Sequence, residues 1–291
     1  MPETNGNLMV FEALIEPMAL HARLGDSNWV VVDCRFNLLD PEAGRRAYRQ
    51  GHIPGAYYAH LEEDLSGPVT PDSGRHPLPA AQHLAHTLGK WGIRETSQVV
   101  VYDDAGGAIA ARLWWLLRWL GHRACAVLNG GLPAWKGQNL PLSTAMPEHH
   151  IGVFPERHND DLWVDSATVL ATVVQGDALL LDARANARYR GEQEPIDPVA
   201  GHIPNAVNLP LEGNLTREGR FLEPAALQSR FAAVLGERAP AQVLHMCGSG
   251  VTACHNLLAM EVAGLQGARL YVGSWSEWIR NPDRPVVTGA F

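Results

Sequence analysis

Short apolar runs alternate with longer segments of helical periodicity along the whole chain. Ala110–Leu120 carries its leucines and tryptophans at helical spacing and is followed by Gly121, which predicts a helix closed by a C-terminal glycine. Several apolar runs have the length of buried strands, among them Val30–Val32, Gln98–Tyr102, Leu179–Leu181 and Gln242–Met246. Strands that alternate with helices predict an α/β fold, with a mainly parallel sheet covered by helices on both faces.

The two halves of the chain repeat one another. Val-Val-Val-Asp-Cys-Arg at 30–35 corresponds to Leu-Leu-Leu-Asp-Ala-Arg at 179–184. Gly-His-Ile-Pro-Gly-Ala at 51–56 corresponds to Gly-His-Ile-Pro-Asn-Ala at 201–206, and further matches follow in the same order at nearly constant separation. Ordered self-similarity of this kind predicts a tandem duplication of one domain.

The duplication sets the expected domain boundaries. We predict one domain over residues 1–142, a proline- and histidine-bearing linker over 143–161, and a second domain over 162–291. His52 and His202 occur in both halves, so we interpret them as structural residues that tie turns together.

Cys247 lies in a glycine-rich loop, Cys-Gly-Ser-Gly-Val-Thr-Ala at 247–253, between an apolar strand and a predicted helix. The amide groups of such a loop and the N-terminus of the helix should converge on the sulfur and favour the nucleophilic thiolate without any neighbouring cation. The alternative is an inert cysteine buried at a strand end. The matching position of the first half is Asp103, so we expect one active site, in the second domain, with the first domain forming one wall of its cleft.

Composition narrows the classes of function. The chain has 291 residues, of which 46% are hydrophobic and 19% charged, as in an ordinary globular protein. Its net charge of -8 gives no general attraction to nucleic acid or anionic lipid, so an anionic substrate must be bound by a local arginine cluster. The four cysteines are too scattered for a disulfide framework, and neither a signal peptide nor a membrane span is present. We therefore expect a cytoplasmic protein, working as a monomer.

Taken together, the tandem domains, the cysteine loop and Gly-Ser-Trp-Ser-Glu-Trp at 273–278 resemble the two-domain sulfurtransferases of the rhodanese family over essentially the whole chain. The loop is similar to that of members that use 3-mercaptopyruvate, whereas thiosulfate-using members carry Arg and Lys directly after the cysteine. The resemblance implies two half-reactions without a metal or cofactor, in which Cys247 takes sulfur from the donor as a persulfide and passes it to a thiol, thioredoxin or cyanide. Thiosulfate as donor, or a persulfide carrier that serves a partner protein, are the alternatives.

The resemblance also implies roles for the other loop residues. The amides of Gly248, Gly250, Val251 and Thr252 should bind the thiolate and the persulfide, and the hydroxyls of Ser249 and Thr252 can donate hydrogen bonds to the sulfur or the donor. A helix N-cap is an equally good interpretation of Thr252.

Proton transfer to the leaving group is implied for a relay of Ser249, His76 and Glu62, with Glu63 and Asp64 as neighbouring alternatives to Glu62. The other interpretation of His76 is an exposed histidine in a proline-rich loop.

The resemblance also implies that the donor carboxylate binds Arg188, which matches the family's binding arginine. The arginine fork suits this role because it can pair with a carboxylate through two hydrogen bonds. Arg190 and Arg184 are weaker candidates, and a solvated helix face or an inter-domain salt bridge is the preferred interpretation of Arg184. Related enzymes place a second arginine before Gly-His-Ile-Pro, but the segment 191–200 has none. On sequence alone the carboxylate site is therefore incomplete.

Two other activities fit the sequence poorly. A cysteine-dependent phosphatase of this fold needs an arginine at the end of the loop, where this chain has Ala253. A zinc site at Cys247, Cys254 and His255 lacks a further ligand pair. We interpret Cys254 as a buried helical thiol, with a role in disulfide formation as the alternative.

Overall fold

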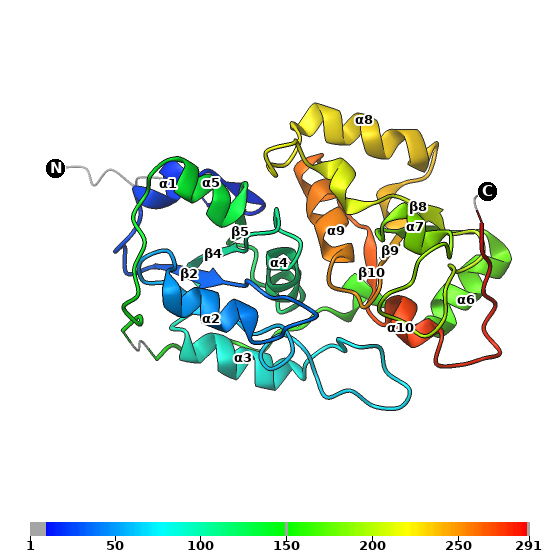
Figure 1. Cartoon of the computed structure of the whole chain (residues 1–291), viewed down its shortest axis with the longest axis horizontal. Coiled ribbons are helices and arrows are strands. Elements are labelled where there is room, and N and C mark those ends of the chain that lie inside the picture. The colour runs from blue at the N-terminus through cyan, green and yellow to red at the C-terminus, as the bar shows by residue number, and fades with distance from the viewer. Residues whose placement is uncertain (1–9, 149–150, 290–291) are drawn as a thin grey trace.

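The computed structural model describes residues 10–148 and 151–289, which form two α/β domains beside each other (Figure 1). Each domain contains a five-stranded sheet, and every strand pairing is parallel. The first sheet has the order β1-β5-β4-β2-β3 and the second the equivalent order β6-β10-β9-β7-β8. The strands are β1 Leu14–Ile15, β2 Trp29–Asp33, β3 Tyr57–Tyr58, β4 Gln98–Tyr102, β5 Cys125–Leu128, β6 Trp163–Val164, β7 Leu179–Asp182, β8 Val207–Asn208, β9 Val243–Met246 and β10 Arg269–Tyr271.

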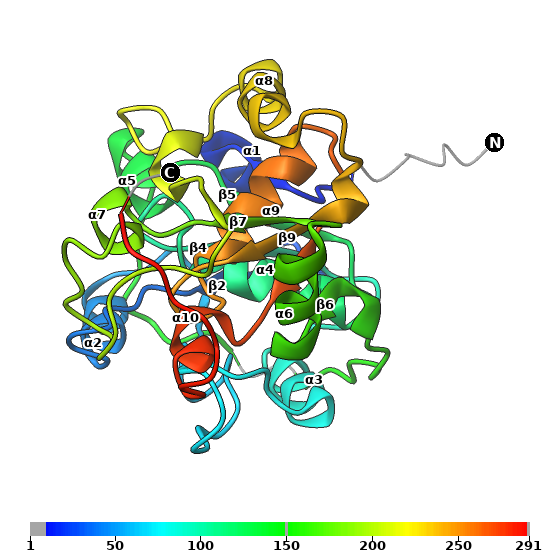
Figure 2. The same cartoon turned by 90° about the vertical axis from the view of Figure 1, so that its right-hand side faces the viewer.

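Helices cover both faces of each sheet, as the alternation of elements predicts. In the first domain, α1 and α5 pack on one face, and α3 and α4 on the other. In the second domain, α6, α7 and α10 pack on one face, and α8 and α9 on the other (Figure 2). None of the described helices is both long and apolar enough to cross a bilayer. The α-helices are α1 Pro17–His21, α2 Ala43–Gln50, α3 Ala81–Lys90, α4 Ala110–Trp119, α5 Gly131–Gly137, α6 Ser166–Gln175, α7 Asn186–Tyr189, α8 Pro224–Leu235, α9 Ala253–Val262 and α10 Ser274–Trp278, and the short 3-10 helices are η1 Asp160–Leu162, η2 Leu211–Asn214 and η3 Pro240–Gln242.

The predicted elements agree closely with those observed. Helix α4 ends at Trp119, and Gly121 follows at φ 81°, the left-handed conformation that glycine adopts after a helix. Strand β9 begins at Val243, one residue later than predicted, because Gln242 closes the turn of η3.

A buried ion pair recurs at the end of the second strand of each repeat. Arg35 pairs with Asp33 at 2.6 Å and donates to the carbonyl of Gly51. Arg184 pairs with Asp182 at 2.8 Å and likewise donates to Gly201. The interpretation of Arg184 as a solvated or inter-domain residue is therefore wrong, because its side chain is buried inside its own domain and lies over the ring of Trp275.

The two repeated histidines hold turns, as predicted. Nδ1 of His52 lies 2.8 Å from the carbonyl oxygen of Tyr48 and Nδ1 of His202 lies 2.8 Å from that of Tyr189, and each imidazole stacks on the tyrosine ring. The histidine backbones bridge to Ser143 and Val287, respectively. The beginning of the predicted linker therefore corresponds to the C-terminal segment of the second repeat.

The rest of the segment between the domains lies along the first domain. Gly152 donates its amide to the carbonyl of Gly89, and Phe154 packs into the core against His122. Asn159 donates to the carbonyl of Trp119, which places the start of the second domain beside the end of α4.

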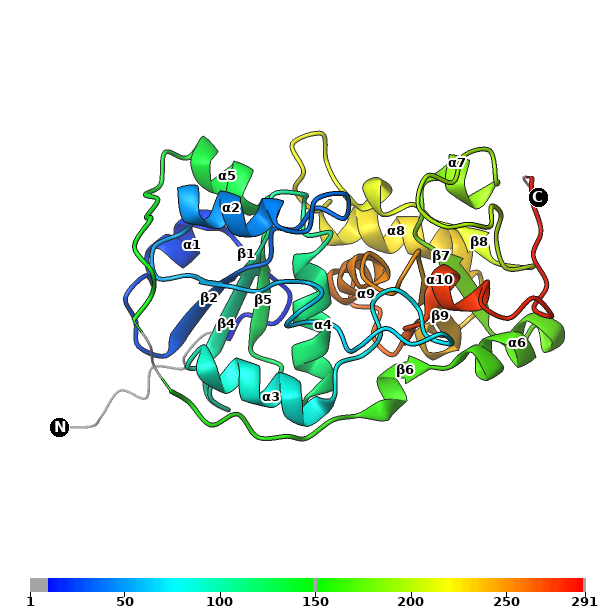
Figure 3. The ribbon, with the colours of Figure 1, turned by 60° about the horizontal axis from the view of Figure 1, so that its bottom comes forward.

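The domains share one continuous hydrophobic core. Helices α4 and α9 pack against each other between the two sheets (Figure 3), and one cluster of buried side chains runs from β4 through both helices to β9. Trp114 and Trp115 belong to this cluster. Because both helices are apolar nearly all around, each depends on the other domain for cover.

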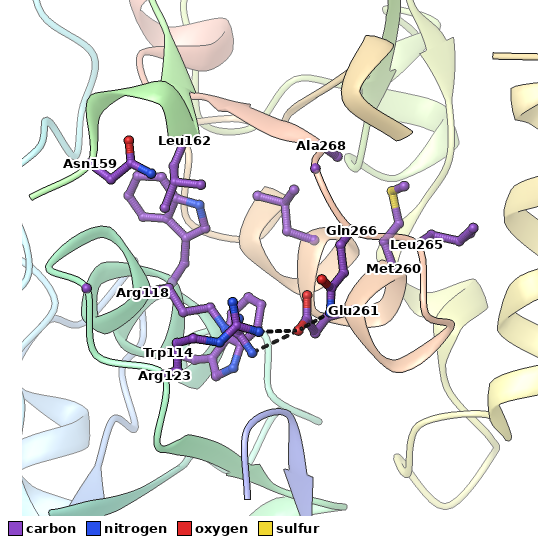
Figure 4. A pocket seen from close by; sticks show the side chains of 14 residues that line it. Trp114, Arg118, Arg123, Asn159, Leu162, Met260, Glu261, Leu265, Gln266 and Ala268 are labelled. Carbon is purple, nitrogen blue, oxygen red and sulfur yellow. Dashed lines mark hydrogen bonds and ion pairs between the residues drawn. The ribbon is translucent and has the colours of Figure 1, made fainter. Parts of the chain in front are cut away.

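A cavity of about 500 Å³ lies near the C-terminal ends of α4 and α9 (Figure 4). Three of its polar side chains converge on one carboxylate: Glu261 lies 3.0 Å from Arg118, 3.1 Å from Gln266 and 3.7 Å from Arg123. Arg118 also lies 4.5 Å over the ring of Trp114. We interpret this cluster as an electrostatic link between the domains.

Replacement of Glu261 should weaken that link. Because Glu261→Gln leaves two arginines without their shared anion, we expect the free energy of unfolding to fall by about 1–2 kcal/mol. Urea denaturation of both proteins measures the change. Glu237→Gln, at an exposed position without an ion pair in the described structure, is the matched control, and an equal loss in the two variants would contradict the interpretation.

Buried neutral histidines should make the fold sensitive to acid. Burial lowers the pKa of His245 in β9 to about 3, from an ordinary value of 6.5. The unfolded chain therefore binds a proton below pH 6.5 that the folded chain does not bind until about pH 3, so stability falls as the pH decreases through this window. At pH 5 this one group should cost about 2 kcal/mol. Urea denaturation at pH 8 and pH 5 should show a smaller loss for His245→Leu than for the wild type, and parallel losses would count against the assignment.

Candidate active site

Cys247 lies directly after β9, at the carboxyl end of the second sheet, and its side chain is buried. Ser274 fixes its backbone, since the hydroxyl of Ser274 accepts the Cys247 amide at 3.1 Å. Ser274 has the unusual φ of 52°, a strained conformation of the kind that structures retain where geometry is functionally needed. Trp275 also donates its amide to the Cys247 carbonyl at 3.0 Å.

The loop then turns sharply into α9. Gly250 adopts a φ of 75°, and a side chain at this position would lie 2.3 Å from the carbonyl oxygen of Val272. Glycine is therefore required there. Within the described structure, the amides of residues 248–252 donate to no protein acceptor, so they remain available to an anion held in the loop.

In the first domain, the amides of the equivalent loop bind a carboxylate. Asp103 occupies the position equivalent to Cys247, and its carbonyl accepts the amide of Leu132 as that of Cys247 accepts Trp275. Its carboxylate receives four backbone amides of the loop and helix start, each at 2.8 Å, from Ala105, Gly107, Ile109 and Ala110. The repeated fold thus forms an amide cradle around a negative side chain at the end of this strand.

The structure brings Ser249, His76 and Glu62 together from both domains. Nδ1 of His76 lies 2.7 Å from the hydroxyl of Ser249, and Nε2 lies 3.9 Å from a carboxylate oxygen of Glu62. His76 is 2% exposed, so the interpretation as an exposed loop histidine is wrong. Glu63 instead pairs with Arg45.

His76 is neutral at physiological pH. Burial, and then the nearby positive charges of Arg112 and Arg75, lower its pKa to about 3. A neutral imidazole can accept a proton at one nitrogen and donate at the other, so it can relay a proton to or from the serine hydroxyl.

Arg188, at the end of α7, is held by acidic residues. Its Nε and Nη2 bond to Glu194, with a shortest distance of 2.7 Å, and Nη2 also reaches Asp197 at 3.1 Å. The guanidinium lies beside the cysteine loop, because a carbon built onto Gly248 would be 3.5 Å from Nη1. Arg190 pairs with Glu192 instead and shares none of these contacts in the described structure.

The two remaining loop residues occupy different environments. Val251 is buried in the shared core, and Thr252 is half-buried at the N-cap position of α9. Thr252 is thus the N-cap residue of α9, as the alternative interpretation predicts, but its hydroxyl makes no capping hydrogen bond in the described structure.

Sequence reasoning missed Arg75, which reaches the site from the first domain. It lies next to His76, and its Nη2 is 3.3 Å from a carbon built onto Gly248. Its Nη1 bonds to Asp197 at 2.5 Å, and its amide donates to the hydroxyl of Ser276 at 3.0 Å. The only sequence signal for a role of Arg75 in the site is its position next to His76.

The expectation that the loop works without a neighbouring cation is wrong. Arg112, in α4, is fully buried and donates to the carbonyl of Gly250 at 3.1 Å. Burial lowers the pKa of its guanidinium, whereas Cys254 and Cys247 raise it, which places a positive charge beside both sulfurs. Burial raises the pKa of Cys254 to about 12, so Cys254 is a protonated thiol, as predicted.

His255 is engaged elsewhere. Its Nε2 lies 3.1 Å from the carbonyl oxygen of Gly106, and its Nδ1 lies 3.2 Å from the side-chain amide of Asn214. Both ring nitrogens are thus occupied, which leaves none for a metal ion held with Cys247.

Comparison with known proteins gives a consistent picture. The profile of the family described as Rhodanese-like domain matches residues 16–138 and 166–281. A probable 3-mercaptopyruvate sulfurtransferase of Pseudomonas aeruginosa is 51% identical over 278 residues, 95% of this chain and 98% of that protein. A putative thiosulfate sulfurtransferase of Mycobacterium tuberculosis, SseB, is 41% identical over 264 residues, 89% of this chain and 90% of that protein.

Two solved structures are also similar to this chain. The 3-mercaptopyruvate sulfurtransferase of Leishmania major has a TM-score of 0.81 and 28% identity, covering 96% of this chain and 75% of that one. SseA of Escherichia coli, a 3-mercaptopyruvate sulfotransferase, has a TM-score of 0.79 and 29% identity, covering 91% of this chain and all of that one. With both halves matched by the family profile, this chain belongs to the rhodanese family as a two-domain sulfurtransferase.

Proposed function

We propose that this enzyme takes sulfur from 3-mercaptopyruvate, holds it as a persulfide on Cys247 and passes it to an acceptor. The observation that carries the proposal is the placement of Cys247 at the head of a loop with unpaired amides, beside the Ser249–His76 pair. The names of similar proteins from Pseudomonas aeruginosa and human support this donor.

The first half-reaction forms the persulfide. The Cys247 thiolate attacks the donor sulfur, and the carbon–sulfur bond breaks with its electron pair on the carbon side, which gives the enolate of pyruvate. The proton of the donor thiol ends on that carbon, giving pyruvate and a deprotonated persulfide. Ser249 and neutral His76 relay the proton, with Glu62 orienting the imidazole.

The second half-reaction returns the cysteine. The acceptor, a thiolate or cyanide, attacks the outer sulfur, the sulfur–sulfur bond breaks, and the Cys247 thiolate leaves. A thiol acceptor becomes a persulfide, a thioredoxin dithiol releases sulfide as it closes to a disulfide, and cyanide becomes thiocyanate. The loop amides of Gly248, Gly250, Val251 and Thr252 stabilise negative charge on both sulfur species, and Arg112 adds a buried positive charge.

A reducing compartment such as the cytoplasm suits this chemistry. All four cysteines are buried and unpaired, and Cys247 has to remain a thiolate between turnovers.

Replacement of the nucleophile tests the mechanism. Cys247→Ser should abolish turnover, at least a 1000-fold loss on the order expected when a covalent step is removed. Incubation of the wild type with donor, followed by intact-mass measurement, should show one added sulfur atom that cyanide removes. Cys254→Ser is the matched control and should retain both activity and the adduct, because its thiol stays protonated. An adduct on Cys247→Ser would disprove the assignment.

The donor preference follows from the uncharged loop. Gly248 and Ser249 offer no cation of their own to a dianion, so kcat/KM for 3-mercaptopyruvate should exceed that for thiosulfate by about 10-fold or more. Pyruvate release and thiocyanate formation measure the two reactions. A higher kcat/KM for thiosulfate would establish the alternative donor, for which the mycobacterial relative is named.

A further inference from the structure

We propose that Arg75, supplied by the first domain, is the second arginine of the donor-carboxylate site and determines specificity together with Arg188. The segment 191–200, where a second arginine is expected, contains none and has Ile196 beside Asp197. The assignment rests on the proposed function, because it names how the mercaptopyruvate carboxylate is held.

Two unpaired guanidinium nitrogens converge beside the cysteine loop. A carbon built onto Gly248 would lie 3.3 Å from Nη2 of Arg75 and 3.5 Å from Nη1 of Arg188. Within the described structure, neither nitrogen donates to a protein acceptor, although the other nitrogens of Arg188 do. The two nitrogens are separated by no more than the sum of those distances, which a carboxylate with two hydrogen bonds of about 2.8 Å can bridge.

The acidic residues behind the arginines fix this orientation. Asp197 gives one carboxylate oxygen to Arg75 at 2.5 Å and the other to Arg188 at 3.1 Å, and its side chain is 3% exposed. Glu194 accepts hydrogen bonds from Nε of Arg188 and from the same Nη2. Because Arg188 is held through Nε and Nη2 and Arg75 through Nη1, the Nη1 of Arg188 and the Nη2 of Arg75 are presented toward Gly248 with little loss of side-chain entropy on binding.

Arg75 and Asp197 also border a cavity. Its volume is about 370 Å³, and Ser276 and Arg280 line it beside them. Gly248 adjoins the nucleophile, and in 3-mercaptopyruvate two carbons separate the sulfur from the carboxylate carbon. A donor with its sulfur at Cys247 can therefore extend its carboxylate toward the two arginines.

A pair of donors that differ only in the carboxylate tests the assignment. We would measure kcat/KM with 3-mercaptopyruvate and with 1-mercaptopropan-2-one, which has a methyl group in place of the carboxylate. Arg75→Gln should lose about 10- to 100-fold with the first donor, as expected for one charge-assisted hydrogen bond, and less than about 3-fold with the second. Arg75→Lys, which keeps the charge without the fork, should lie between Arg75→Gln and the wild type.

Arg280→Gln is the matched control, because it removes the same charge from the same cavity at an exposed position. It should behave like the wild type with both donors. Equal losses of Arg75→Gln on both donors, or no loss with 3-mercaptopyruvate, would overturn the assignment. The melting temperature of Arg75→Gln shows whether this variant is misfolded. If it is, the same comparison of the two donors with Arg75→Lys tests the assignment.

Failure of the proposed function has a different signature. If the proposed function is wrong, the wild type turns over neither 3-mercaptopyruvate nor 1-mercaptopropan-2-one, and neither do the Arg75 variants. In that case, calorimetric titration with pyruvate decides whether the carboxylate site exists. Binding that Arg75→Gln weakens about 10-fold or more supports the site, whereas binding that is absent or unchanged by Arg75→Gln rejects it.

Discussion

Backbone amides at the junction of a parallel strand and the following helix stabilise negative charge, and the rest of this structure is arranged around that property. In the first domain, four amides close on the carboxylate of Asp103. In the second, the equivalent amides, which follow Cys247 in the chain, have no protein acceptor in the described structure. The duplicated fold thus places a carboxylate in one copy and a cysteine sulfur in the other.

The first domain completes the site. It contributes His76 to the serine, Arg112 to the carbonyl of Gly250 and Arg75 to Asp197, all across the domain boundary. The arginines differ in their surroundings. Arg112 is fully buried in the domain interface, whereas Arg75 and Arg188 both pair with the carboxylate of Asp197. The first domain, which has Asp103 at the position of the cysteine, therefore supplies side chains to the loop of the second domain.

Much of the fold could be predicted because it depends on local patterns. Strand-length apolar runs, the helix closed by Gly121 and the repeated Gly-His-Ile-Pro motif each act within one domain. Cys247 could be identified for the same reason, since its glycines serve the turn in which it lies. The pairing of Ser249 with His76 required the resemblance to a known family, because nothing local to either residue indicates the other.

Contacts across the domain interface could not be predicted from those patterns. Arg112 has the sequence surroundings of an ordinary helical arginine between alanines and leucines, yet it is fully buried. Its position follows from the packing of α4 on α9, which periodicity does not encode. The same holds for Arg75, whose flanking glycine and histidine indicate a loop and give no sign of the acidic partner on the other domain.

The single core that runs through α4 and α9 has an evolutionary consequence. Duplicated domains with a polar, hydrated interface can each fold alone, so they can later be encoded separately or combined with other domains. Here α4 and α9 bury each other's apolar side chains. A single domain would therefore expose an apolar surface to water, and the second domain would lack the side chains that the first contributes to the site. A substitution on either helix of this interface therefore affects the stability of both domains.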